Sequence, residues 1–243
     1  MAEEKLWKTR LEVKRLTIGK RELGRGKVGI VYSGRIWFAD QKSKKVAVKV
    51  FNPEMTEEFF DRPHIDEEIV RHYEEVIAKL RKEKLPVLKT GFVKHGGKFV
   101  QVQELYAKST GSKITDPRRL DVLPQEYDLQ IIRDPQTKER LLDTISGIIN
   151  AGLIPHHDTI GIVKTKTGNR LIIHDLDFLA HTNYLNDNPE LNNQGLEMVL
   201  NLWRKDFREA GIPHEEFIGG LKTRVKTKEG LAAIREMERP EHE

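Results

Sequence analysis

Residues 24–31 read GRGKVGIV, and the strand-like residues that follow decide how this stretch folds. Gly24, Gly26 and Gly29 fit the spacing G-x-G-x-x-G, which by itself is a weak signal. In a dinucleotide-binding fold such a loop opens a helix, whereas here β-branched and aromatic residues continue over 29–38. The stretch therefore predicts a strand–loop–strand hairpin whose backbone N–H groups can approach phosphates. An ordinary hairpin with a glycine turn is the alternative.

A lysine in the next strand bears on this choice. Residues 46–51 read VAVKVF, an apolar run that predicts a strand. Alternation places Lys49 on the same face as Ala47 and Phe51. Lys49 is then either a solvated residue at an alternate position or a phosphate-binding lysine held by a carboxylate.

A helix expected over 65–84 offers that carboxylate. Apolar residues recur at helical spacing from Ile65 onward, and Pro86 ends the helix. On the helical wheel Glu68 lies beside the apolar stripe, whereas Glu67 faces away from it. Glu68 can thus reach inward to Lys49, although two acids at a helix N-terminus can also simply face solvent. A hairpin follows, with its turn at His95-Gly96-Gly97.

The glycine loop, V-A-V-K at 46–49 and a glutamate nineteen residues after the lysine resemble the N-lobe of a protein kinase. In that family the glycine loop covers ATP, the lysine binds its phosphates, and the end of the hairpin forms a hinge against the adenine. The resemblance implies ATP contacts from Leu23, Gly24, Gly26, Gly29, Val31, Ala47, Lys49, Glu104 and Tyr106.

The second half of the chain resembles a reduced kinase C-lobe. Helices are expected over 138–150, 194–207 and 228–237. The first leads to residues 152–158, which read GLIPHHD and resemble the start of a catalytic loop. Asp158 would orient the acceptor hydroxyl and take its proton. An apolar strand over 171–173 then runs into His174, Asp175, Leu176 and Asp177. The resemblance implies that Asp175 is the metal-binding aspartate and that Asp177 is an auxiliary Mg²⁺ ligand. The alternative alignment starts the motif at Asp177.

This half departs from the kinase pattern at three positions. His157 replaces the arginine beside the catalytic aspartate, and Ile160 stands where a lysine is usual. The second metal-binding asparagine is missing, with Val163 at its place if the loop keeps its length. An inactive pseudokinase that binds nucleotide or acts as a scaffold is therefore the main alternative to an enzyme.

These features predict an α+β, bilobal protein-kinase-like fold. Residues 1–106 form the N-lobe, with a five-stranded antiparallel sheet and one helix, and residues 107–243 form the reduced, mainly helical C-lobe. The predicted function is that of an ATP- and Mg²⁺-dependent phosphotransferase, an atypical Ser/Thr protein kinase with a protein substrate. The D-x-D sequence also occurs in kinase-like sugar kinases, so a small-molecule or sugar kinase is a further alternative.

Composition excludes several other classes. The 243 residues contain no cysteine, which rules out disulfides and thiolate metal sites. The net charge of +4 is spread along the chain and accompanies no nucleic-acid motif, so a nucleic-acid partner is not expected. No stretch predicts a membrane span, and residues 1–10 carry no apolar signal-peptide core, so we expect a cytoplasmic protein, or one in a host cytosol if it is a secreted effector. Adjacent His156 and His157, with His174, make a poor zinc site because their side chains diverge.

The replacement at His157 bears on regulation. In many kinases the arginine there binds a phosphate on the activation segment and thereby orders it. A neutral imidazole offers one donor and cannot make that bidentate contact. The corresponding segment, 175–190, is short, and its phosphate-accepting hydroxyls are Thr182 and Tyr184. We therefore expect an enzyme that does not need activation-segment phosphorylation.

Overall fold

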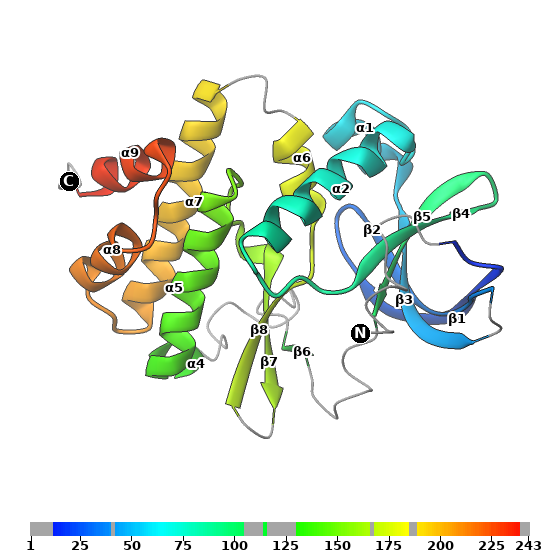
Figure 1. Cartoon of the computed structure of the whole chain (residues 1–243), viewed down its shortest axis with the longest axis horizontal. Coiled ribbons are helices and arrows are strands. Elements are labelled where there is room, and N and C mark those ends of the chain that lie inside the picture. Colours follow the sequence, from blue (N-terminus) through cyan, green and yellow to red (C-terminus); the bar gives the residue numbers. More distant parts are fainter. Residues whose placement is uncertain are drawn as a thin grey trace. The chain divides into compact units, whose positions relative to one another are not determined.

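The computed structural model describes residues 12–39, 42–104, 114–115, 130–165, 168–184 and 189–238 (Figure 1). The chain divides into two compact units. Unit 1 comprises Met1–Glu75 and Leu88–Thr110, and unit 2 comprises Val76–Val87 and Gly111–Glu243. Residues 76–87 thus group with the second unit. The predicted lobe boundary at residue 106 lies outside the described residues and stays a prediction.

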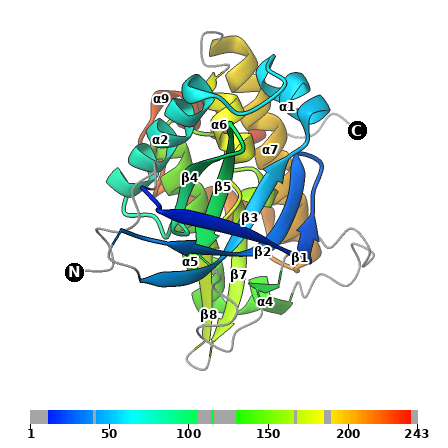
Figure 2. The same ribbon diagram turned by 90° about the vertical axis from the view of Figure 1, so that its right-hand side faces the viewer.

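Unit 1 contains a five-stranded sheet in the order β1-β2-β3-β5-β4, with every neighbouring pair antiparallel (Figure 2). This confirms the predicted α+β fold class and its antiparallel sheet. The strands are β1 (Arg15–Arg25), β2 (Gly29–Trp37), β3 (Ser43–Phe51), β4 (Thr90–His95) and β5 (Lys98–Glu104).

The turn between β4 and β5 is the predicted glycine turn. Gly96 and Gly97 have φ of +58° and +79°, a conformation that glycine adopts without steric cost. Two consecutive positive φ angles match the right-handed twist of the strands that the turn joins. The turn fixes the register of the hairpin, with His95 opposite Lys98.

The two faces of this sheet are covered differently. One face carries an apolar cluster built around Ile36, Val46, Val48 and Val102, each fully buried. The other face carries Phe92 of β4. The centroid of its ring lies 4.8 Å from that of Tyr73, which belongs to a helix that packs on this face. The alternation of strand side chains therefore gives one face to a sheet core and the other to helices.

Two helices precede β4. The helix α2 (Glu67–Lys82) lies within the range 65–84 expected from its spacing. The shorter helix α1 (Pro53–Phe60) is an addition to the single helix that the sequence predicts for this half. Its periodic signal is weak because it buries only Thr56 and Phe60. Its start is nevertheless well defined, since the Asn52 side chain accepts a hydrogen bond from the backbone N–H of Glu54.

Unit 2 is mainly helical, as predicted. Helices expected over 138–150, 194–207 and 228–237 correspond to α5, α7 and α9, whereas α4, α6 and α8 were not predicted. The helices are α4 (Gln130–Arg133), α5 (Pro135–Asn150), α6 (Asp177–Tyr184), α7 (Pro189–Glu209), α8 (His214–Lys222) and α9 (Lys228–Met237). Unit 2 also contains a small antiparallel sheet in the order β6-β7-β8. Its strands are β6 (Ile114–Thr115), β7 (Ile160–Thr165) and β8 (Gly168–Ile173).

Close packing within unit 2 holds these elements together. The rings of Phe207 in α7 and Phe217 in α8 lie 4.6 Å apart. A Cβ on Gly220 of α8 would meet a methyl group of Leu142 in α5 at 2.7 Å, so the two helices approach closely at a glycine. The backbone N–H of Ile173 donates to Pro86 O at 2.8 Å, which ties β8 to the segment after α2.

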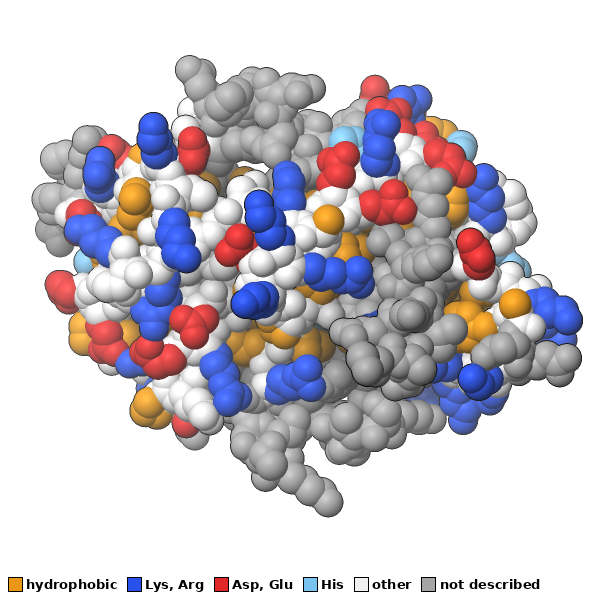
Figure 3. Space-filling view, in the orientation of Figure 1, with side chains coloured by type: hydrophobic (Ala, Val, Ile, Leu, Met, Phe, Trp, Pro, Cys, Tyr) orange, Lys and Arg blue, Asp and Glu red, His pale blue; other side chains and the backbone are white. Residues whose placement is uncertain are grey.

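The surface is densely charged. On the face shown in Figure 3, lysine and arginine side chains are interspersed with aspartate and glutamate. Among the described residues, no helix is both long and apolar enough to cross a lipid bilayer.

Candidate functional site

The glycine loop connects β1 and β2, as the sequence predicts. Its glycines differ in what surrounds them. A Cβ on Gly29 would lie 2.5 Å from the backbone oxygen of Val50, so close strand packing explains this glycine. Among the described residues, a Cβ on Gly24 would meet nothing within 4 Å, and one on Gly26 would meet only Gly29 O, at 4.0 Å. Packing within the chain therefore does not require Gly24 or Gly26, and the open space above both fits a group that approaches the backbone closely.

Helix α1 supports this loop. Lys27, between Gly26 and Gly29, forms an ion pair with Glu58 at 2.9 Å, and its ammonium lies 5.6 Å from the ring centroid of Phe59. The carbonyl of Val28 accepts a hydrogen bond from Asn52 N–H at 2.9 Å. Sequence reasoning missed this support because it did not predict α1.

Lys49 lies on β3 directly opposite Val31 of β2, and Val31 is directly opposite Gly24 of β1. Direct cross-strand partners project on the same face of a sheet, so the glycine loop and Lys49 share one face. The Lys49 side chain is only 8% exposed. Because lysine side chains are seldom this buried, the position fits a binding role better than a solvated one. The solvated alternative for Lys49 is therefore disfavoured.

The three apolar residues predicted to contact a nucleotide lie in the strands β1, β2 and β3. Leu23 is 37% exposed at a bulge in β1, an unusual exposure for a large apolar side chain. Val31 and Ala47 are half-buried on β2 and β3. Glu104 is the last residue of β5, and its backbone N–H donates to Lys89 O at 2.9 Å. Tyr106 lies outside the described residues.

The structure pairs Glu68 with Arg62, not with Lys49. The Arg62 guanidinium donates to the Glu68 carboxylate at 3.2 Å, and the Glu68 side chain is 45% exposed. Glu67 lies on the other side of the helix start, 2.7 Å from the ammonium of Lys94. The predicted contact from Glu68 to Lys49 therefore remains a prediction, and it requires Glu68 to leave Arg62.

The loop resembling a catalytic loop is anchored to α7 in unit 2. The indole N–H of Trp203 donates to Pro155 O at 2.6 Å, and the ring of His157 lies 4.1 Å from that of Trp203. His157 Nδ1 is 3.3 Å from a carboxylate oxygen of Asp206. Asp158 follows in the short 3₁₀ helix His157–Thr159, and its side chain is outside what the structure describes. Sequence reasoning missed Asp206, which lies 49 positions after His157 and carries no local motif.

The candidate metal ligands follow β8. The backbone N–H of His174 donates to Thr159 O at 3.0 Å, which extends the β7–β8 pairing beyond Ile160 and Ile173. Asp158 immediately precedes Thr159, and Asp175 immediately follows His174. The hydrogen bond between Thr159 and His174 therefore places the backbones of the two aspartates near each other. Asp175 Oδ1 accepts a hydrogen bond from Asp177 N–H at 3.1 Å, and Asp177 begins α6. Asp177 is 3% exposed, whereas Asp175 is more accessible.

The departures from the kinase pattern have a structural cause. The strand β7 begins at Ile160, two residues after Asp158, and Ile160 is 2% exposed opposite Ile173. Val163 lies within β7 opposite Arg170. The catalytic-loop equivalent is therefore short, and the strand occupies the positions where a kinase carries its loop lysine and second metal-binding asparagine.

His156 and His157 pack against aromatic rings. Across the described residues, no group of three or more His, Asp or Glu side chains is placed to hold a metal ion. The ring of His156 instead stacks on Phe178 at 4.1 Å between centroids, and His157 contacts Trp203. Both rings serve packing around the loop.

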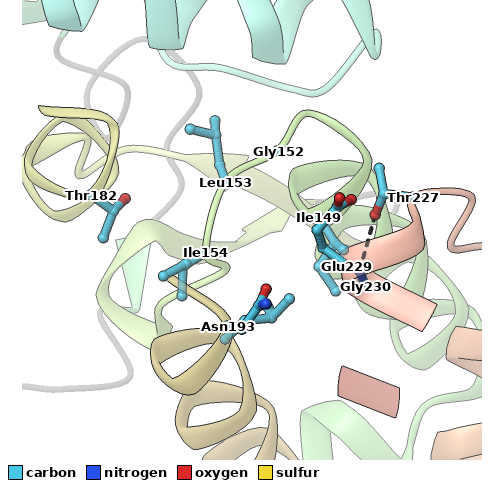
Figure 4. A pocket seen from close by; sticks show the side chains of 10 residues that line it. Ile149, Gly152, Leu153, Ile154, Thr182, Asn193, Thr227, Glu229 and Gly230 are labelled. Carbon is cyan, nitrogen blue, oxygen red and sulfur yellow. Dashed lines mark hydrogen bonds between the residues drawn. The ribbon is translucent and has the colours of Figure 1, made fainter. Parts of the chain in front are cut away.

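A separate cavity of about 230 Å³ lies in unit 2 (Figure 4). Its wall includes Leu153 and Ile154 before the catalytic-loop equivalent, Leu196 of α7, and Thr227 and Gly230 at the start of α9. The dashed line in Figure 4 marks the bond from Gly230 N–H to Thr227 Oγ1, which caps α9. No predicted site residue lines this cavity.

The chain is similar to solved structures of a kinase domain. No protein-family model and no curated protein sequence matches the chain. Among solved structures, the kinase domain of Mycobacterium tuberculosis PknI matches with a TM-score of 0.41 and 15% identity, over 70% of this chain and 63% of that one. A double mutant of the same domain matches with a TM-score of 0.43 and 14% identity, over 70% and 62% of the two chains. The five-stranded antiparallel sheet and the order of its elements agree with the α+β, kinase-like fold that the sequence predicts.

Proposed function

We propose that this protein is an ATP- and Mg²⁺-dependent phosphotransferase, an atypical kinase that phosphorylates serine or threonine hydroxyls of a protein. The observation that carries the proposal is the buried Lys49 on the same face as Gly24, with open space above that glycine. A cation and free backbone beside an apolar face suit the phosphates and base of a nucleotide.

The residues of the two units have complementary roles in this proposal. In unit 1, Lys49 binds phosphate oxygens of ATP, and the glycine loop approaches the phosphates with its backbone. In unit 2, Asp175 and Asp177 provide carboxylate oxygens, the ligand type that Mg²⁺ prefers. Bound Mg²⁺ would neutralise charge on the phosphates.

Asp158 acts on the acceptor. Its carboxylate orients the acceptor hydroxyl and takes its proton as the hydroxyl oxygen bonds to the γ-phosphorus. The bond from the γ-phosphorus to the bridging oxygen breaks, and ADP leaves with that electron pair. The anchoring of the preceding residues by Trp203 and Asp206 holds this loop in place without a phosphate on the chain.

Replacing Lys49 tests the proposal. Lys49→Met should lower phosphate transfer to a generic protein acceptor about 10²–10³-fold, the usual effect of removing one charged group that stabilises the transition state. Because methionine fills a similar volume without a buried charge, the melting temperature should stay close to that of the wild type. Lys45→Met, an exposed lysine on the same strand, is the matched control and should keep full activity. Unchanged transfer by Lys49→Met would refute the assignment.

A nucleotide-binding pseudokinase is the second candidate. Two observations favour it: Glu68 contacts Arg62 instead of Lys49, and β7 replaces the second metal-binding position. Titration of the wild-type chain with MgATP, beside an assay of transfer, separates the candidates. Binding together with transfer supports the kinase, whereas tight binding without any transfer to added protein or to the chain itself identifies the pseudokinase.

A further inference from the structure

One row of directly paired residues crosses all five strands of the sheet in unit 1. It runs from Gly24 through Val31, Lys49 and Gln101 to Phe92. Direct partners in antiparallel strands project on the same face, with Cβ atoms about 4.5–5.5 Å apart. Gln101 is therefore the immediate neighbour of Lys49 on the side away from the glycine loop.

Gln101 is buried and its amide nitrogen is unsatisfied. The residue is 1% exposed, and among the described residues Nε2 has no hydrogen-bond partner. A buried donor without an acceptor costs about 1–3 kcal/mol, and such groups are rare in folded proteins. Its other neighbour in the row, Phe92, is covered by Tyr73 and offers no acceptor. Packing alone would favour an apolar side chain at this position.

The chemistry of the two neighbours indicates what the missing group is. The Lys49 ammonium carries only donors, so it cannot accept from Gln101 Nε2. Both groups can donate to the same acceptor, however, if that acceptor carries several lone pairs. An oxyanion meets this requirement, because its oxygens can accept from an amide and from an ammonium at the same time.

We propose that Gln101 and Lys49 form a two-donor site for one oxyanion, in which Gln101 is a further binding residue. The inference rests on the proposed function, because it gives the phosphate-binding lysine a second donor. The oxyanion has two available sources. One is a phosphate of the nucleotide, and the other is the carboxylate of Glu68 after it leaves Arg62, a residue of the same unit.

Gln101→Met tests the site, because methionine keeps much of the volume and removes the amide. The variant should bind MgATP and MgADP about 10- to 100-fold more weakly, the range for one hydrogen bond to a charged group. Adenosine, which carries no phosphate, is the internal control and should bind as it does to the wild type. The melting temperature without ligand should stay the same or rise, since an unsatisfied buried amide is removed. A purely structural glutamine predicts the opposite, a lower melting temperature with unchanged nucleotide affinity, and that result would overturn the inference.

The same measurements in a Glu68→Gln background distinguish the two sources. If Gln101→Met weakens nucleotide binding there as much as in the wild type, the acceptor is a nucleotide phosphate. If its effect disappears, the acceptor is the Glu68 carboxylate. Both results support the two-donor site.

Pyrophosphate separates failure of this inference from failure of the proposed function. A wild-type chain that binds neither MgATP nor pyrophosphate contradicts both. A third outcome is that the wild type binds pyrophosphate but not ATP, and that Gln101→Met weakens the binding of pyrophosphate. This result would support the oxyanion site and refute the proposed kinase function. If the wild type and the Gln101→Met variant bind MgATP equally, the oxyanion site is refuted and the proposed function is not.

Discussion

At the scale of single residues, Asp175 and Asp177 differ in ways that assign them different tasks. Asp177 is 3% exposed and begins α6, whereas Asp175 is more accessible and directly follows the last residues of the β7–β8 pairing. One oxygen of Asp175 accepts a hydrogen bond from Asp177 N–H, which orients the carboxylate. The accessible and oriented carboxylate is the better candidate for the principal metal ligand.

Matched substitutions check this assignment. Asp175→Asn should lower Mg²⁺-dependent transfer about 10²–10³-fold and raise the Mg²⁺ concentration needed for half-maximal activity, because one charged oxygen ligand is lost. Asp177→Asn keeps nearly the same shape and should have the smaller effect on both quantities. If Asp177→Asn proves the more damaging of the two in a Mg²⁺ titration, the roles are reversed.

At the scale of secondary-structure elements, the start of α5 depends on an ionised side chain. Asp134 accepts a hydrogen bond from Thr137 N–H at 2.8 Å and another from the Thr137 hydroxyl, which caps the helix. The Thr137 hydroxyl, followed by its backbone N–H, lowers the pKa of Asp134 below its ordinary value of 3.8. Because the pKa is lower in the folded chain, this group stabilises the fold above the ordinary pKa, and the contribution is lost as the pH falls through the folded value.

Melting curves at several pH values measure this effect. Asp134→Ala should lower the melting temperature at pH 7, because the cap is lost. Asp134→Asn keeps a capping oxygen without the charge and should lie between the wild type and Asp134→Ala. The gap between the wild type and Asp134→Asn should close as the pH falls below the folded pKa of Asp134. A gap independent of pH would show that the charge of Asp134 does not contribute.

Long elements with clear periodicity were predictable, and short ones were not. The helix α9 coincides with its expected range, 228–237, because its apolar residues are regularly spaced. The glycine turn at Gly96 was predicted because its chemistry is local. In contrast, α6 begins directly at Asp177, within the short segment 175–190, where the sequence analysis expected no helix. Its eight residues follow a strand without a glycine or proline between them, so local signals do not mark its start.

The candidate site shows the same limit. Motif spacing identified Lys49 and the glycine loop, and the strand register confirms that they share a face. Gln101 was missed, although polar residues at 101 and 103 alternate with Val100 and Val102 and so break an otherwise apolar strand. Its importance becomes visible only through the pairing with Lys49, which is a long-range contact. The pairing of Glu68 with Arg62 likewise depends on how the chain turns before α2.

At the scale of the whole molecule, the structure bears on how activity is controlled. The segment that follows Asp175 forms α6, and within it Thr182 is 8% exposed and donates its hydroxyl to Leu179 O at 3.1 Å. A phosphate on Thr182 would replace that bond with a charge in a buried position. Meanwhile His157 contacts Asp206 and Trp203, which are fixed parts of α7. The loop is thus anchored by the fold itself, whereas in many kinases a phosphorylated segment supplies this anchor.

We therefore predict activity without phosphorylation of this segment. The double variant Thr182→Ala/Tyr184→Phe should keep wild-type transfer to a generic acceptor, also after phosphatase treatment. Asp206→Ala should instead lower the turnover rate more than it raises the KM for ATP, because it loosens the loop that carries Asp158 and leaves the glycine loop of unit 1 unchanged. Asp206→Glu keeps the charge and should restore part of that rate, which distinguishes positioning of the loop from general destabilisation. If the double variant loses activity and acidic replacements at the same two positions restore it, the enzyme is switched by phosphorylation and the anchoring by α7 is not sufficient.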